Sequence, residues 1–196
     1  MGETESKENV DSIPFINDEK KALIVRSIGI LILIIVIVQD VIFILTDKID
    51  SLLYTTFLTT LLIGLTLIYQ FDSVFLNTLT SLTFMGFIHI SILFIPVAKS
   101  IEKVLGGVIY HSLIAIFQSI LVFHKKIKIS KKYLLWGFVF YLAFFNGYDT
   151  FARWNEIVGL NILISTKSTQ TYAFYTLIFS AVFIYHYKKK YNVLAE

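Results

Sequence analysis

The chain has 196 residues, of which 56% are hydrophobic and only 16% are charged, and its formal net charge is +3. A soluble domain carries roughly 25% charged residues, and a disordered chain cannot keep so many large apolar side chains out of water, so both classes are excluded. The absence of cysteine also excludes disulfides, thiolate-bound metals and cysteine nucleophiles.

Long apolar segments predict membrane-spanning helices. Residues 1–21 are polar and form an N-terminal tail, after which residues 22–46 are long enough, at ~1.5 Å per residue, to cross a hydrocarbon core of ~30 Å. Five more apolar segments follow, and residues 188–196 form a basic C-terminal tail; the five segments are 52–69, 74–98, 104–123, 133–154 and 170–187. The sequence therefore predicts an all-α, polytopic integral membrane bundle of six transmembrane helices, which together make a membrane domain over residues 22–187.

The connections between these segments predict the topology. Four of the five are short, so consecutive helices are expected to be antiparallel neighbours in an up-and-down bundle. The fifth, residues 155–169, is too apolar for a free loop and too short to span, so we expect it to lie in the interface or dip back into the bundle. Gly86, near the middle of segment 74–98, permits close helix contact or a bend.

Lysine and arginine predict the orientation. Twelve of the 17 basic residues fall on the side of the two termini and five fall on the other side. Because cytoplasmic loops carry the excess of positive charge, both termini are expected in the cytoplasm, most simply across the plasma membrane.

Polar residues inside the apolar segments are the candidates for a functional site, because each costs free energy in lipid unless it faces protein or water. Counting from the segment midpoints places them all in the outer half of the bilayer, as a polar pocket of Asp40, His89, His111, Asn146, Asp149 and Arg153. The last three share one helix face, since they stand at i, i+3 and i+7. Gly107, His111 and Gln118 form a stripe of small and polar residues suited to close helix packing.

Three interpretations of this pocket stay open. His89, His111 and Asp149 have the side chains that bind zinc, iron or copper. The same groups can pass protons or hold a cation in transit. Alternatively the pocket is structural, with Asp149 paired to Arg153 and the histidines bonded to neighbouring carbonyls or hydroxyls.

A short basic loop lies between the fourth and fifth segments. It can bind anionic lipid head groups, at ~1 kcal/mol per basic side chain, or act only as a positive-inside signal. Its basic residues are Lys125, Lys126, Lys128, Lys131 and Lys132. Nucleic acid is not an expected partner, because the basic residues lie between apolar runs rather than on one basic face.

These features predict a non-catalytic membrane protein. One version is an accessory subunit that packs against other membrane chains or copies of itself. The other is a small carrier or channel whose path is lined by Asp40, His89, His111 and Asp149. The alternative class is a metal-dependent membrane enzyme with its ion on the His and Asp residues, although no GxSxG, HExxH or Walker A motif is present and no catalytic residue is assigned.

Overall fold

The computed structural model describes residues 16, 18–46, 55–95, 104, 108–157 and 166–195 of the chain. Helices make up most of this part, which confirms the all-α prediction. The helices are α1 (Glu19–Leu45), α2 (Thr55–Ile68), α3 (Val74–Leu82), α4 (Phe84–Phe94), α5 (Tyr110–Phe123), α6 (Lys131–Ile157) and α7 (Thr166–Lys190), and two short strands are β1 (Ile129–Ser130) and β2 (Leu194–Ala195).

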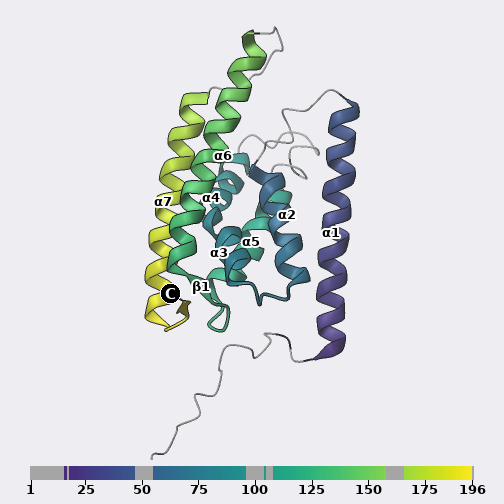
Figure 1. Ribbon diagram of the computed structural model, residues 1–196, viewed down its shortest axis with the longest axis vertical. Helices are drawn as coiled ribbons and strands as arrows, with labels where there is room; N and C mark the ends of the chain where they lie inside the picture. Colours follow the sequence, from purple (N-terminus) through teal and green to yellow (C-terminus); the bar gives the residue numbers. More distant parts are fainter. Residues whose placement is uncertain are drawn as a thin grey trace, which may run out of the picture.

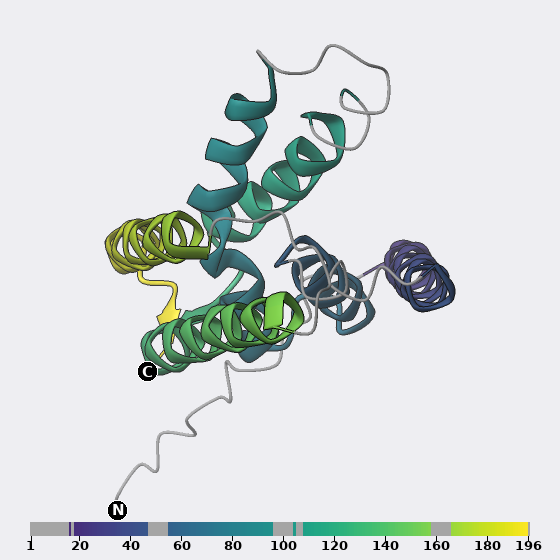
Figure 2. The ribbon, with the colours of Figure 1, turned by 90° about the horizontal axis from the view of Figure 1, so that it is seen from above.

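The helices α1, α6 and α7 run roughly along the long axis of the molecule, and successive helices alternate in direction (Figure 1). The helices α4 and α5 are inclined to that axis and extend sideways in the view from above (Figure 2). The helices α3 and α4 follow one another on either side of Thr83. We use the word pass for each helical segment between two connections, so that α3 and α4 together are the third pass. Seen from above, α1 stands at one edge beyond α2, and α6 and α7 lie on the other side of the molecule (Figure 2). The described helices therefore follow the alternating order that the short connections predict.

Two described stretches are long and apolar enough to cross a membrane, Glu19–Leu45 and Val74–Ile92. The apolar helices Thr56–Ile68 and Tyr110–Phe123 are shorter. Length and composition of the described residues thus support two of the six predicted spans.

Several boundaries differ from the prediction. The helix α1 begins before residue 22 because the Asp18 carboxylate caps it, accepting from the backbone N–H groups of Lys20 and Lys21. The helix α6 runs past residue 154 to Ile157, and α7 starts at Thr166. Of the segment 155–169, residues 158–165 lie outside the described residues, so its predicted place at the interface is a matter for experiment. The helix breaks at Thr83, three residues before Gly86, where the sequence permitted close helix contact or a bend.

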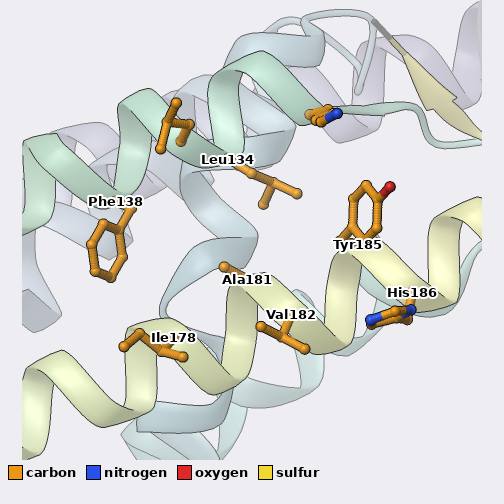
Figure 3. A pocket seen from close by; sticks show the side chains of 9 residues that line it. Leu134, Phe138, Ile178, Ala181, Val182, Tyr185 and His186 are labelled. Carbon is orange, nitrogen blue, oxygen red and sulfur yellow. The ribbon is translucent and has the colours of Figure 1, made fainter.

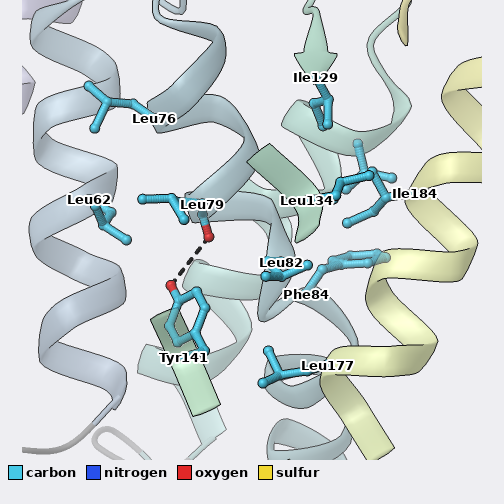
Figure 4. Packing of buried hydrophobic residues seen from close by; sticks show 11 residues of the cluster. Leu62, Leu76, Leu79, Leu82, Phe84, Ile129, Leu134, Tyr141, Leu177 and Ile184 are labelled. Atoms are coloured by element: carbon cyan, nitrogen blue, oxygen red, sulfur yellow. Dashed lines mark hydrogen bonds between the residues drawn. The ribbon is translucent and has the colours of Figure 1, made fainter. Parts of the chain in front are cut away.

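The helix α3 lies at the centre of the molecule. It contacts α2, α5, α6, α7 and β1, and its residues Leu76 to Leu82 are all buried. Leucines from α3 form the main apolar core together with side chains from α2, α6 and α7 (Figure 4). A second, smaller apolar cluster lies between α2, α4 and α5, around Ile63, Phe87 and Ile114.

The outer surface of the helices is apolar. Large hydrophobic side chains on α1, α5, α6 and α7 are about half exposed; examples are Leu31, Leu113, Trp136 and Phe179. The buried positions, in contrast, include many polar side chains, among them Thr59, Thr66, Asn77, Thr78, Thr80, Ser81 and Gln118. The exposed part of this distribution differs from that of a water-soluble protein, which rarely exposes large contiguous apolar patches.

One end of the molecule collects the basic residues. The N-terminal end of α1, the loop before β1, the start of α6 and the C-terminal end of α7 all lie at this basic end (Figure 1). There β2 pairs in parallel with β1, with Ile129 opposite Leu194, so the C-terminal segment folds back onto the loop. The Lys188 side chain is fully buried beneath it and donates to the carbonyls of His124 at 2.9 Å and Ile127 at 2.7 Å.

Candidate functional site

The third pass carries an unusual density of polar side chains. Within Asn77 to Thr83, five of seven residues are Asn, Thr or Ser, and the four that belong to α3 share one face of the helix, opposite its leucines. All of them are buried, because other helices surround α3. Some bond both within the helix and to another element: the Thr78 hydroxyl donates to the Val74 carbonyl of α3 and accepts from the backbone N–H of Ser130 on β1.

The pass is broken at Thr83. Thr83 has φ −89° and ψ 7°, and its N–H bonds to the Ser81 carbonyl instead of to a residue four positions back. Neither glycine nor proline stands at the break. A break of this kind frees backbone carbonyls at the end of α3 and N–H groups at the start of α4, which need other partners when no water is present.

Side chains from two other passes satisfy these backbone groups. The Gln118 amide on α5 donates to the Thr80 carbonyl at 2.6 Å and to the Thr83 hydroxyl oxygen at 2.8 Å. On the opposite side, the Met85 N–H donates to the Ser180 hydroxyl of α7 at 3.0 Å. The break in the helix is therefore stabilised by side chains of α5 and α7, which are distant in the sequence.

We call the group around the break the polar centre, defined as Thr59, Thr83, Gln118 and Tyr141. The Thr59 and Thr83 hydroxyls are 3.4 Å apart. The Tyr141 hydroxyl donates to the Leu79 carbonyl at 3.2 Å (Figure 4) and lies beside the hydroxyls of Thr59 and Thr83. Thr59, Gln118 and Tyr141 are fully buried, so α2, α5 and α6 converge on the broken pass.

One oxygen in the polar centre has no partner. The Gln118 NH₂ group faces the Thr80 carbonyl, which only accepts, so the orientation of the amide is fixed and its Oε1 points elsewhere. No hydrogen-bond partner reaches that Oε1 among the described residues. Leaving such an oxygen dry costs about 1 to 3 kcal/mol, so the centre favours an added hydrogen-bond donor.

Asn77 repeats this arrangement closer to the basic end. Its Nδ2 donates to the carbonyls of Phe71 at 2.6 Å and Lys128 at 3.4 Å, and its Oδ1 is buried without a partner among the described residues. Between Asn77 and the polar centre, the hydroxyls of Thr66 and Thr80 are 3.0 Å apart. Buried polar groups thus follow α3 from the basic end to the break.

The two predicted pocket histidines have different surroundings. His111 on α5 contacts α2 through Thr56, with 3.4 Å between Nε2 and the hydroxyl oxygen, and its ring stacks on Phe87 at 5.8 Å. His89 on α4 is exposed and lines a groove against α7.

The other predicted pocket residues lie on α1 and α6. Asp40 is partly buried on α1, whose main contact is with α2. Asn146, Asp149 and Arg153 belong to α6, but their side chains lie outside the description.

The metal site remains a prediction. The described side chains contain no group of three or more His, Cys, Asp or Glu residues suited to an ion. Asp149, one of the three expected ligands, is outside this test. A metal on His89, His111 and Asp149 therefore has to be sought by experiment.

The five lysines predicted to bind lipid head groups are all exposed at the basic end. The Lys125 ammonium lies 4.7 Å from the centre of the Tyr191 ring, and Lys131 lines a groove between α6 and α7. The basic residues 126, 128 and 132 face outward around them. Burial, followed by the nearby charges of Lys188 and Lys126, lowers the pKa of His124 in the same loop, so this histidine is uncharged at neutral pH.

No protein-family model, curated protein or solved structure matches this chain. Its function has to be argued from its own residues.

Proposed function

We propose that the protein is a multi-pass integral membrane protein with six membrane-spanning segments. The observation that supports this is the distribution of side chains: large apolar groups cover the outer faces of α1, α5, α6 and α7, while threonine, serine, asparagine and glutamine lie buried beside the apolar core. Lipid is the solvent that favours such a surface, because polar groups in a bilayer are stable only where they bond inside the protein.

The gathering of lysines at one end supports an orientation with that end in the cytoplasm. Both described ends of the chain, α1 and β2, lie there. Because the chain has no cysteine, single cysteines report sidedness directly. In sealed cells, a membrane-impermeant maleimide is expected to label Thr46→Cys, and to label Lys126→Cys and Lys189→Cys only after permeabilisation; labelling of all three in sealed cells would overturn this topology.

Within the membrane, the protein acts as a small carrier or channel. The polar centre supports this function, because a broken helix near the middle of the bundle, lined by polar groups from several passes, is the usual form of a solute site in membrane transporters. The unpartnered Gln118 Oε1 supplies a free acceptor at that place. The pocket predicted from Asp40, His89, His111 and Asp149 is then a possible outer entrance to the path, not its central site.

The chemistry of the polar centre favours a neutral solute. Its side chains are hydroxyls and one amide, with no charged group among them. A fully charged solute would lose its hydration without a counter-charge, at a cost of several kcal/mol. Small molecules that donate hydrogen bonds, such as urea or glycerol, match the free oxygen and carry no such cost.

The experiment is solute flux into proteoliposomes, followed by light scattering after mixing with urea or glycerol. The protein is expected to raise the permeability for at least one of them above that of protein-free liposomes. Gln118→Met and Tyr141→Phe should each reduce the increase, whereas Leu113→Ala, on the exposed side of α5, should retain it. Permeability equal to that of protein-free liposomes would overturn the carrier function.

An accessory subunit is the second candidate, and the observation that favours it is the isolation of α1. This helix packs mainly against α2 and leaves most of its length apolar and exposed. Native mass spectrometry of the gently extracted protein distinguishes the two: stable association with other polypeptides supports a subunit, and a lone chain or homo-oligomer supports the carrier. A bound transition metal in the same spectrum would instead support the metal-dependent enzyme.

A further inference from the structure

An open groove of about 330 Å³ runs between α6 and α7. Leu134 and Phe138 of α6 face Ile178 and Ala181 of α7 across it, so most of its wall is aliphatic or aromatic (Figure 3). A groove with this lining on the outer surface of a membrane protein accommodates a hydrocarbon chain.

The end of the groove nearest the basic end is polar. Lys131, Tyr185 and His186 line it there, and Tyr185 extends from α7 toward α6 (Figure 3). The Lys189 ammonium lies 5.8 Å from the centre of the Tyr185 ring, which adds a second lysine next to the groove. None of the side chains lining the groove is acidic.

We propose that this groove binds one phospholipid with an anionic head group. The acyl chain lies between α6 and α7, and the phosphate sits at the cytoplasmic surface between Lys131, Lys189 and the Tyr185 hydroxyl. The groove fits both parts of the lipid. Its apolar wall, which runs toward the middle of the bundle, fits the acyl chain, and the lysines at its interfacial end fit the anionic head group. This proposal rests on the membrane location proposed above and is independent of any transport activity.

A second groove on the other side of α7 extends the site. It has a volume of about 510 Å³, lies against α4 and shares Val182 and His186 with the first groove. The two grooves thus meet at the polar end, which gives room for the second acyl chain of the same lipid on the α4 side of α7.

The lysines that matter are not those expected from the sequence alone. Of the five basic residues of the loop, Lys131 is the one that lines the groove, whereas Lys125 is turned to Tyr191. Selective binding therefore depends on Lys131 and Lys189, and not on the charge of the basic end as a whole. The control is Lys20→Gln with Lys21→Gln, which removes two exposed lysines at the same end but on α1.

The test is native mass spectrometry of the detergent-purified protein titrated with phosphatidylglycerol or phosphatidylcholine. We expect one tightly retained phosphatidylglycerol per chain and no comparable phosphatidylcholine adduct. Lys131→Gln with Lys189→Gln should weaken phosphatidylglycerol binding about thirtyfold, at roughly fivefold per basic side chain, while the α1 control changes it less than about twofold.

A second variant tests the apolar wall of the groove separately from the lysines. Ala181→Trp fills the apolar wall and keeps every lysine, and it should reduce retention of phosphatidylglycerol while circular dichroism shows an unchanged helix content. Equal loss in the α1 control, or equal retention of both lipids, would overturn the proposal. Because binding is measured directly in detergent, a negative result leaves the flux and labelling experiments intact.

Discussion

The first and third passes of this protein are both apolar by composition, but different forces hold them. Of the 27 residues of α1, only Gly29 and Val36 are buried, whereas seven consecutive residues of α3 are buried. The helix α1 meets α2 by close backbone approach. The helix α3 meets its neighbours through hydrogen bonds such as those from Gln118 and Tyr141.

In the membrane location proposed above, this difference follows from what burial is worth in lipid. Apolar side chains gain little by leaving lipid for a protein interior, so they do not decide which helix becomes central. Polar groups gain most, because their bonding partners are found only inside the protein. The central place of α3 follows from its Asn, Thr and Ser residues, and the outer place of α1 from their scarcity, since Ser27 is the one such residue in that helix.

The largest expected effect comes from removing the side chain that caps the break. Gln118→Leu leaves the Thr80 carbonyl without its partner and deprives the Thr83 hydroxyl of a donor, which should destabilise the protein by about 3 kcal/mol. The measurement is the thermal unfolding midpoint in detergent, followed by tryptophan fluorescence. Leu113→Ala, an exposed position on the same helix, is the control and should change the midpoint little. Equal midpoints for Gln118→Leu and the control would show that the amide does not hold the break.

A smaller effect is expected where α1 meets α2. A Cβ on Gly29 would lie 2.7 Å from the Gly64 carbonyl oxygen, which is backbone and cannot move aside freely. We expect Gly29→Ala to push α1 away from α2 and destabilise the protein by about 1 to 2 kcal/mol. Limited proteolysis should then release α1 before the other helices.

Gly86→Ala is the matched control for this substitution. The nearest atom to a Cβ at Gly86 is the Thr176 hydroxyl oxygen at 3.6 Å, an ordinary contact. The variant should therefore be neutral or gain up to about 1 kcal/mol from the higher helix propensity of alanine. Protection of α1 in Gly29→Ala, or loosening of α1 in Gly86→Ala, would show that close backbone approach is not what holds this pair.

The sequence predicted the helical character of the apolar segments, because long apolar runs bounded by charges have few other structures available. The segment 22–46 corresponds to Glu19–Leu45, and 52–69 to Thr55–Ile68. It did not predict the break at Thr83, since the groups that stabilise the break, Gln118 and Ser180, are 35 and 97 residues away in the chain. The pairing of β1 with β2 also had no local signal.

The polar centre was missed because ionisable residues were chosen as the markers of a site. Gln118 was assigned to a stripe suited to helix packing and the threonines were not considered, although one signal for the centre was present. Asn77, Thr78, Thr80 and Ser81 share one face of the helix, and a helix cannot turn such a face to lipid without leaving polar groups unbonded. The leucines on the opposite face pack in the main apolar core, so α3 has protein on both sides.

The smallest expected effect on stability concerns the contacts that hold the end of α3 nearest the basic end. The loop that receives Asn77 and Thr78 is held by the buried Lys188, whereas the lysines at the start of α1 are exposed. Burial lowers the pKa of Lys188 to about 8, from an ordinary value of 10.5. Between these two pH values the folded protein has released the proton and the unfolded chain still binds it, so stability rises with pH through this window.

The rise due to Lys188 should be about 1 kcal/mol or less between pH 8 and pH 9, because water near the basic end screens part of the effect. It is measured as the difference in unfolding midpoint between these two pH values in detergent. Lys188→Met should abolish the rise, while Lys189→Met, at the exposed neighbouring position, should keep it. A rise that is the same in both variants would assign the pH dependence to other groups, and Lys188 would then hold the loop only through its two carbonyl contacts.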